Sequence, residues 1–119
     1  MMFEERLQNL RDRVEGAVAT ALVAQDGIRV ASAETEGGPD LDALSALLVA
    51  RIQQLARAQQ DLDLGSLRQF SLATDRFDVV AGEVGAGYYL LLVLESGGNS
   101  GRARYELRRA RLDFEEDLG

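Results

Sequence analysis

The 119-residue sequence contains neither cysteine nor histidine. Their absence excludes disulfide bonds, thiol chemistry, histidine general-base catalysis and nearly every type of zinc site. Lysine is absent as well, so all 13 basic residues are arginine, and 20 acidic residues bring the formal net charge to −7. An acidic chain of this kind is a poor nucleic-acid binder, because neutralising phosphates requires a basic surface.

Proline occurs once, at Pro39, and no apolar run approaches the roughly 20 residues that a membrane-spanning helix requires. The first six residues are already charged and lack the apolar segment of a signal peptide. We therefore expect a cytoplasmic protein without membrane insertion. No linker or low-complexity segment divides the chain, so we expect residues 1–119 to form one domain with one core.

Three segments carry apolar residues at steps of three or four, the spacing that places them on one face of a helix. We predict helices over residues 3–15, over residues 40–60, and from Asn99 or Ser100 to the end of the chain. Asp40, just after Pro39, suits the N-cap of the second helix. The residues predicted to face the core are Phe3, Leu7, Leu10, Val14, Leu41, Leu44, Leu48, Ile52, Leu55, Ala103, Leu107, Ala110, Phe114 and Leu118.

Five runs of β-prone residues predict strands over residues 17–24, 28–31, 67–73, 77–84 and 88–94. The tripeptide Gln25-Asp26-Gly27 separates the first two runs and predicts a hairpin with a type I′ turn, in which both central residues have positive φ. The run 88–94 is apolar at every position. A strand of this kind must be covered on both faces, so we place it centrally in the sheet.

The resulting order of elements is α-β-β-α-β-β-β-α. Short connections favour antiparallel neighbours, because parallel strands would need longer crossovers. The fold class predicted is therefore α/β, a three-layer sandwich around a five-stranded antiparallel sheet. The second helix covers one face of this sheet, and the terminal helices share the other.

The sequence offers no pattern that indicates catalysis or a bound cofactor. Its carboxylates lie at helix ends and in turns, where the helix dipole and turn geometry account for them. We predict a protein that is not an enzyme, with no catalytic residues, no metal and no cofactor. An enzyme using a metal held by oxygen ligands is the least favoured alternative.

The second helix is the most informative segment, because it is apolar or small nearly all round. Opposite its leucine and isoleucine stripe lie three alanines, and only Arg51 and Arg57 carry charge between Asp42 and Asp61. Small side chains let another backbone approach closely, although alanine also serves helix propensity. We predict an interface on this helix. Its residues are Ala43, Ala46, Leu47, Ala50, Gln53, Gln54 and Arg57.

Charge is distributed unevenly along the chain. Residues 34–63 hold six acidic residues and two arginines, a net charge of −4. The acidic residues lie at both ends of the second helix, where their field would steer a basic partner. On the last helix, Arg104, Arg108 and Arg111 follow one flank, and Arg109 and Asp113 are spaced as an i,i+4 pair. We interpret these arginines as a solvated face with weak ion pairs; the alternative is docking of an acidic partner.

Two stretches resemble sequences of the roadblock family, which is named from a dynein light chain. The first comprises Gly16-Ala17 and Leu22-Val23-Ala24-Gln25-Asp26-Gly27-Ile28-Arg29-Val30-Ala31-Ser32, and it is similar to the opening hairpin of that family. The second comprises Val84-Gly85, the run 88–94 and residues 99–110, and it resembles the closing strand and helix of bacterial members. The resemblance covers nearly the whole chain, and among bacterial members the gliding-motility protein B type is similar to it.

This resemblance implies a homodimer in which the central helix and the third strand of each subunit meet and extend the sheet. Here those segments are residues 40–60 and 67–73, so the interface would also include Arg68, Phe70 and Leu72. The resemblance further implies binding of a small Ras-like GTPase. The gliding type activates GTP hydrolysis by its GTPase. That type repositions the GTPase's own residues rather than inserting an arginine, so no catalytic arginine is implied.

A small-molecule-binding sensor module is the alternative function, because sensory domains also use five-stranded antiparallel sheets. It predicts a cavity lined by convergent polar groups. The uniformly apolar run 88–94 favours a filled core instead.

Overall fold

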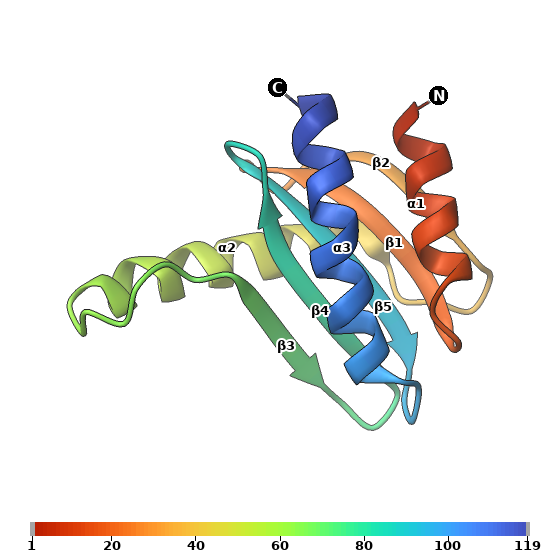
Figure 1. Cartoon of the computed structure of the whole chain (residues 1–119). Coiled ribbons are helices and arrows are strands. Elements are labelled where there is room, and N and C mark those ends of the chain that lie inside the picture. Colours follow the sequence, from red (N-terminus) through yellow and green to blue (C-terminus); the bar gives the residue numbers. More distant parts are fainter. Residues whose placement is uncertain (1, 119) are drawn as a thin grey trace.

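The computed structural model describes residues 2–118, which form three helices and one antiparallel sheet (Figure 1). In chain order the elements are α1 (Met2–Asp12), β1 (Ala17–Ala24), β2 (Arg29–Glu34), α2 (Leu41–Gln60), β3 (Gln69–Ala73), β4 (Phe77–Val84), β5 (Tyr88–Glu95) and α3 (Ser100–Leu118). The strands lie in the order β2-β1-β5-β4-β3. Helices α1 and α3 pack on one face of the sheet and α2 packs on the other. The predicted three-layer sandwich is confirmed.

Strand β5 is the centre of the molecule. It pairs with β1 on one side and with β4 on the other. Leu90, Leu92 and Leu94 are buried against the α1 and α3 layer, while Leu91 and Val93 are buried against α2. Burial on both faces explains why this strand shows no polar alternation.

The predicted boundaries are close to the observed ones. Helix α1 ends at Asp12, three residues before the predicted end, although Val14 is still buried. Helices α2 and α3 begin where predicted, with Asp40 and Asn99 as their N-caps. Asp40 Oδ1 accepts a hydrogen bond from Ala43 N–H at 3.2 Å, and Asn99 Oδ1 accepts one from Arg102 N–H at 2.9 Å. Strand β3 begins at Gln69, two residues later than predicted.

The β1–β2 hairpin is confirmed, but the predicted type I′ turn is wrong. Gly27 has a φ of +84°, whereas Asp26 is not among the residues with positive φ. The loop spans three residues and closes with Gly27 N–H donating to Ala24 C=O at 2.9 Å and Ala24 N–H donating to Ile28 C=O at 3.0 Å. Asp26 Oδ1 accepts from Ile28 N–H at 3.0 Å. Only the glycine therefore has to be left-handed, as in hairpins that end in a glycine bulge.

The two terminal helices are joined to each other and to the sheet. The rings of Phe3 and Phe114 stack with centroids 6.0 Å apart, and Arg6 forms ion pairs with Asp113 and Asp117. Arg109 instead approaches Glu106 at 3.4 Å, so the predicted pair of Arg109 with Asp113 is wrong. Asp113 faces α1, where Arg6 competes for its carboxylate.

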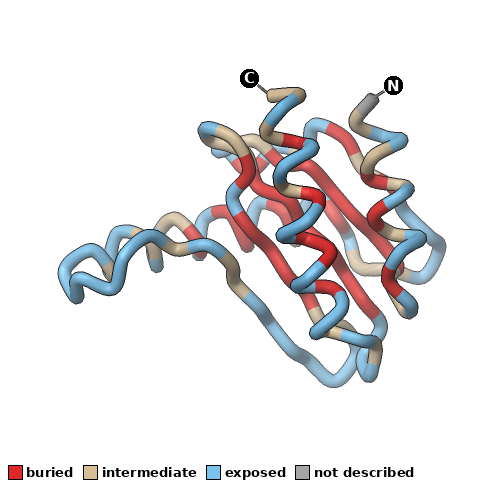
Figure 2. The backbone as a smooth tube through the Cα atoms, in the orientation of Figure 1, coloured by how far each residue is buried: buried red, intermediate tan, exposed pale blue. Residues whose placement is uncertain are grey.

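The predicted apolar stripe of α2 is wrong at one position. Leu41, Leu48 and Ile52 are buried as predicted, but Leu55 is 42% exposed and Val49 is buried in its place. Helix α2 crosses the sheet obliquely, and its last turns extend past the strands that its first turns cover (Figures 1 and 2). Beyond Ile52 there is no sheet beneath the helix to bury Leu55.

None of the helices in the range 2–118 combines the length and the apolar character needed to cross a membrane.

We expect Gly27 to be required both for its positive φ and for the close approach of the β1–β2 turn to α2. A Cβ atom there would lie 3.1 Å from Ala46 Cα, whereas at Gly37, with a similar φ of +89°, it would meet nothing within 4 Å. Gly27→Ala should lower the free energy of unfolding by about 2–3 kcal/mol and Gly37→Ala by about 1 kcal/mol. Urea unfolding of both variants measures the difference, and equal losses would contradict the close approach of the hairpin to α2.

Candidate interaction surface on α2 and β3

The outward side of α2 is accessible as predicted. Six of its predicted interface residues are exposed and Gln53 is half-buried; the exposed ones are Ala43, Ala46, Leu47, Ala50, Gln54 and Arg57. Leu47 is 50% exposed, an unusual state for a leucine on a helix that also packs against a core. Leu55 adds a second exposed leucine that the sequence pattern assigned to the core.

Two of these residues already have partners within the chain. Ala46 lies against Gly27 of the β1–β2 turn, so its small side chain lets the chain's own hairpin approach. Gln53 Nε2 donates to the backbone carbonyl of Gln25 at 2.8 Å. These contacts fix the hairpin to one flank of α2. The remaining accessible flank is centred on Leu47, Ala50 and Gln54.

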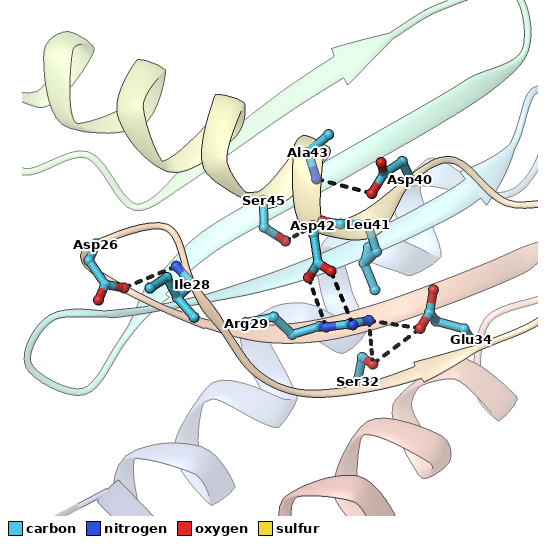
Figure 3. A network of polar contacts seen from close by, with 10 residues as sticks. All are labelled: Asp26, Ile28, Arg29, Ser32, Glu34, Asp40, Leu41, Asp42, Ala43 and Ser45. Atoms are coloured by element: carbon cyan, nitrogen blue, oxygen red, sulfur yellow. Dashed lines mark hydrogen bonds and ion pairs between the residues drawn. The ribbon is translucent and has the colours of Figure 1, made fainter.

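An arginine network fixes the start of α2 (Figure 3). Arg29 of β2 contacts Glu34 at 2.8 Å, Asp42 at 3.1 Å and the hydroxyl of Ser32 at 3.1 Å. Asp42 and Glu34 are two of the six acidic residues that bracket α2 in the sequence. Their charges are therefore offset by Arg29, and the negative field at this end of α2 is weaker than the sequence indicates.

Strand β3 supplies the second part of the predicted interface. It is an edge strand, and it is largely exposed (Figure 2). Phe70 packs partly against the α2 layer, Leu72 on the same side of the strand is exposed, and Arg68 lies exposed just before the strand. An exposed edge with apolar side chains tends to pair with another chain.

A cleft of about 480 Å³ lies between the end of α2 and β3. Ile52 and Ala56 line it from the helix and Phe70 from the strand, so it brings the two predicted parts of the interface together. The buried polar residues among those described are Thr20, Ser45 and Glu106, and none of them lines the cleft. Polar residues also line the cleft, among them Gln59, Gln69 and Arg111, each of which is half-buried.

Two further apolar residues belong to this region and were not predicted. Leu62 and Leu64, in the connection from α2 to β3, are 69% and 72% exposed. Their signal in the sequence is weak, because single leucines between acidic residues are common in solvated loops. Within residues 2–118, acidic residues form no group of three or more suited to a metal ion.

Comparison with known proteins identifies the family. Residues 3–94 match the family model of the Roadblock/LC7 domain. The chain belongs to this family. Among curated proteins, none matches the sequence.

Solved roadblock structures share the fold. A Roadblock/LC7 domain from Streptomyces avermitilis superposes with a TM-score of 0.86 at 20% identity, covering 97% of this chain and 96% of that one. The gliding protein MglB from Thermus thermophilus gives 0.83 at 20% identity over 94% and 84%. MglC from Myxococcus xanthus gives 0.71 at 28% identity over 99% and 100%. This roadblock domain is thus similar to the MglB proteins.

The contact of Gln53 with the hairpin is expected to stabilise the roadblock fold itself. Gln53→Ala should lower the free energy of unfolding by about 1 kcal/mol, because it removes the hydrogen bond to the Gln25 carbonyl. The neighbouring variant Gln54→Ala should change it by less than about 0.5 kcal/mol, since the one side-chain hydrogen bond of Gln54 within residues 2–118 comes from Arg51 of its own helix. Urea unfolding compares the two, and a larger loss for Gln54→Ala would contradict the assignment.

Proposed function

We propose that this roadblock domain is a non-enzymatic homodimer in which α2 and β3 of the two subunits meet. The observation that carries this proposal is the continuity of the exposed side of α2 with an unpaired edge strand. Leu47 and Ala50 lie on the helix, and Phe70 and Leu72 lie on the strand. Pairing of β3 with its copy would satisfy its free backbone groups and continue the sheet across the dimer.

Exposed leucines around this surface support the same conclusion. Leu47, Leu55, Leu62 and Leu64 are all more than 40% exposed and come from α2 or from the connection that follows it. Grouped apolar side chains on a surface usually mark a place where another protein excludes water. Covering them is favourable, at about 25 cal/mol per Å² of apolar surface removed from water.

We propose further that the dimer binds a small Ras-like GTPase as a regulator or scaffold, within the cytoplasm. Support comes from membership in the roadblock family and from the structural similarity to MglB and MglC. The contact surface would be formed by the paired α2 helices, because the small side chain of Ala50 admits close approach of a partner. No arginine of this chain is assigned to the GTPase's chemistry.

Charge substitution on α2 is expected to disrupt the homodimer. Ala50→Glu and Leu47→Glu would each bury an unpaired carboxylate in the interface, weakening dimerisation by about 100-fold. Light scattering coupled to size-exclusion chromatography should then give a mass near 13.0 kDa, against twice that mass for the unmodified protein.

A matched control is available on the opposite layer. Leu112 of α3 is 70% exposed and lies on the other face of the sheet, so Leu112→Glu should leave the dimer intact. Thermal unfolding followed by circular dichroism checks that all three variants are folded. A folded Ala50→Glu protein that remains fully dimeric would exclude this helix as the dimer interface.

Binding of a GTPase is tested by affinity capture from native cytoplasm with tagged protein, with GDP in one sample and a non-hydrolysable GTP analogue in the other. We expect a Ras-like GTPase, identified by mass spectrometry, to be enriched with the GTP analogue. Turnover of the purified GTPase with and without this protein then separates an activator from a scaffold.

The same capture with Ala50→Glu should lose the GTPase, while Leu112→Glu should retain it. Equal recovery with GDP and with the analogue would indicate a scaffold that does not distinguish the nucleotide. Failure to recover any GTPase with either nucleotide would contradict the proposed partner. It would not bear on the proposed homodimer, which light scattering tests.

A further inference from the structure

A second recess adjoins the cleft between α2 and β3 and lies between α3 and the paired strands β3 and β4; the two share Arg68, Gln69, Gly82, Glu83 and Arg111 in their linings. The volume of this second recess is about 190 Å³. Leu107 and Val84, both buried, and Gly82 form its apolar floor, and Arg68, Arg108 and Arg111 stand around it. This basic groove, as we call it, combines an apolar floor with a cationic rim.

The groove depends on the close approach of three segments at Gly82. A Cβ atom at this position would lie 3.0 Å from the Arg68 carbonyl oxygen and 3.4 Å from Leu107 Cδ2. Gln69 Nε2 donates to the carbonyl of Arg104 at 3.1 Å and fixes α3 to the start of β3. Helix α3 lies over β4 and β5, and β3 is left largely exposed (Figures 1 and 2).

Two of the three arginines that line the groove have no carboxylate partner. Within residues 2–118, no carboxylate lies within 4.0 Å of the guanidinium groups of Arg68 or Arg108, and Arg111 is paired with Glu115 at 2.7 Å. The other arginines divide into those that contact a carboxylate, such as Arg29, and those that do not, such as Arg51. Glu83 is the acidic residue that lines the groove. A positive region therefore stands on a protein whose net charge is −7.

We propose that the basic groove binds an acidic segment of a partner protein that also carries an apolar side chain. Carboxylates of the segment would pair with Arg108 and Arg111, one helical turn apart, and with Arg68 across the groove. Guanidinium groups suit this role because they bind carboxylates through two parallel hydrogen bonds. The apolar side chain would cover Leu107 and Val84.

A protein segment fits this surface better than a nucleic acid does. A phosphate backbone would continue past the groove onto a surface that is acidic overall, where it would be repelled. The groove adjoins the cleft between α2 and β3, whereas Val84, Leu107 and Arg108 line the groove and not that cleft. Because Arg68 is also assigned to the dimer interface, the test uses Arg108 and Arg111 of α3.

The test measures binding of a fluorescent peptide of about 12 residues, rich in Asp and Glu with one central Leu, by anisotropy at low salt. Arg108→Gln/Arg111→Gln should weaken binding at least about tenfold. Arg13→Gln/Arg51→Gln, which removes two exposed arginines elsewhere, should change it less than about twofold. Replacing the central Leu with Gly should weaken binding as well, because the apolar floor is then uncovered.

Three outcomes would overturn the proposal: no binding of the peptide by the unmodified protein, equal weakening by both double variants, or displacement of the peptide by inorganic phosphate more strongly than by sodium chloride of equal ionic strength. The last result would indicate a site for small anions. Light scattering on the same samples shows whether the dimer persists, so loss of peptide binding is distinguished from loss of the dimer.

Discussion

Strand β5 is apolar on both of its faces, and each face has to be shielded from water. Leu90, Leu92 and Leu94 are covered by α1 and α3, and Leu91 and Val93 are covered by α2. This requirement places β5 at the centre of the sheet and sets the number of layers. The hairpins on either side, β1 with β2 and β3 with β4, then become the flanks of the same sheet.

The helices cover the two faces of the sheet unevenly, because the width of a five-stranded sheet does not match that of one or two helices. Five strands spaced by about 4.8 Å are wider than one helix, whose diameter with side chains is about 10 Å. Two helices on one face leave β3 largely uncovered, and the single oblique α2 on the other face leaves its own last turns without support. The exposed leucines of α2 and the free edge of β3 follow from this geometry, and the proposed dimer rests on these two features.

Arginine serves two purposes in this protein. Arg6 connects α1 to the end of α3, and Arg29 connects β2 to the start of α2 through Asp42. Arg6 thus joins the two helices of one layer and Arg29 joins the sheet to the other layer, with their charge offset by carboxylates. Arg68 and Arg108 hold no such partner among the described residues, and both line a recess with an apolar floor.

The order of helices and strands, the antiparallel sheet and the central place of β5 could be predicted from the sequence, because apolar periodicity and turn residues are local properties of the chain. The exposed side of α2 could be predicted for the same reason. Tertiary structure decided what depends on distant neighbours. Leu55 fits the apolar stripe of α2, yet it is exposed because the sheet ends before it. Ala46 lies against Gly27, nineteen residues earlier in the chain, and a larger side chain would hinder this contact. The basic groove likewise unites Arg68 with Arg108, because Gly82 lets the backbone before β3 and helix α3 come together over β4.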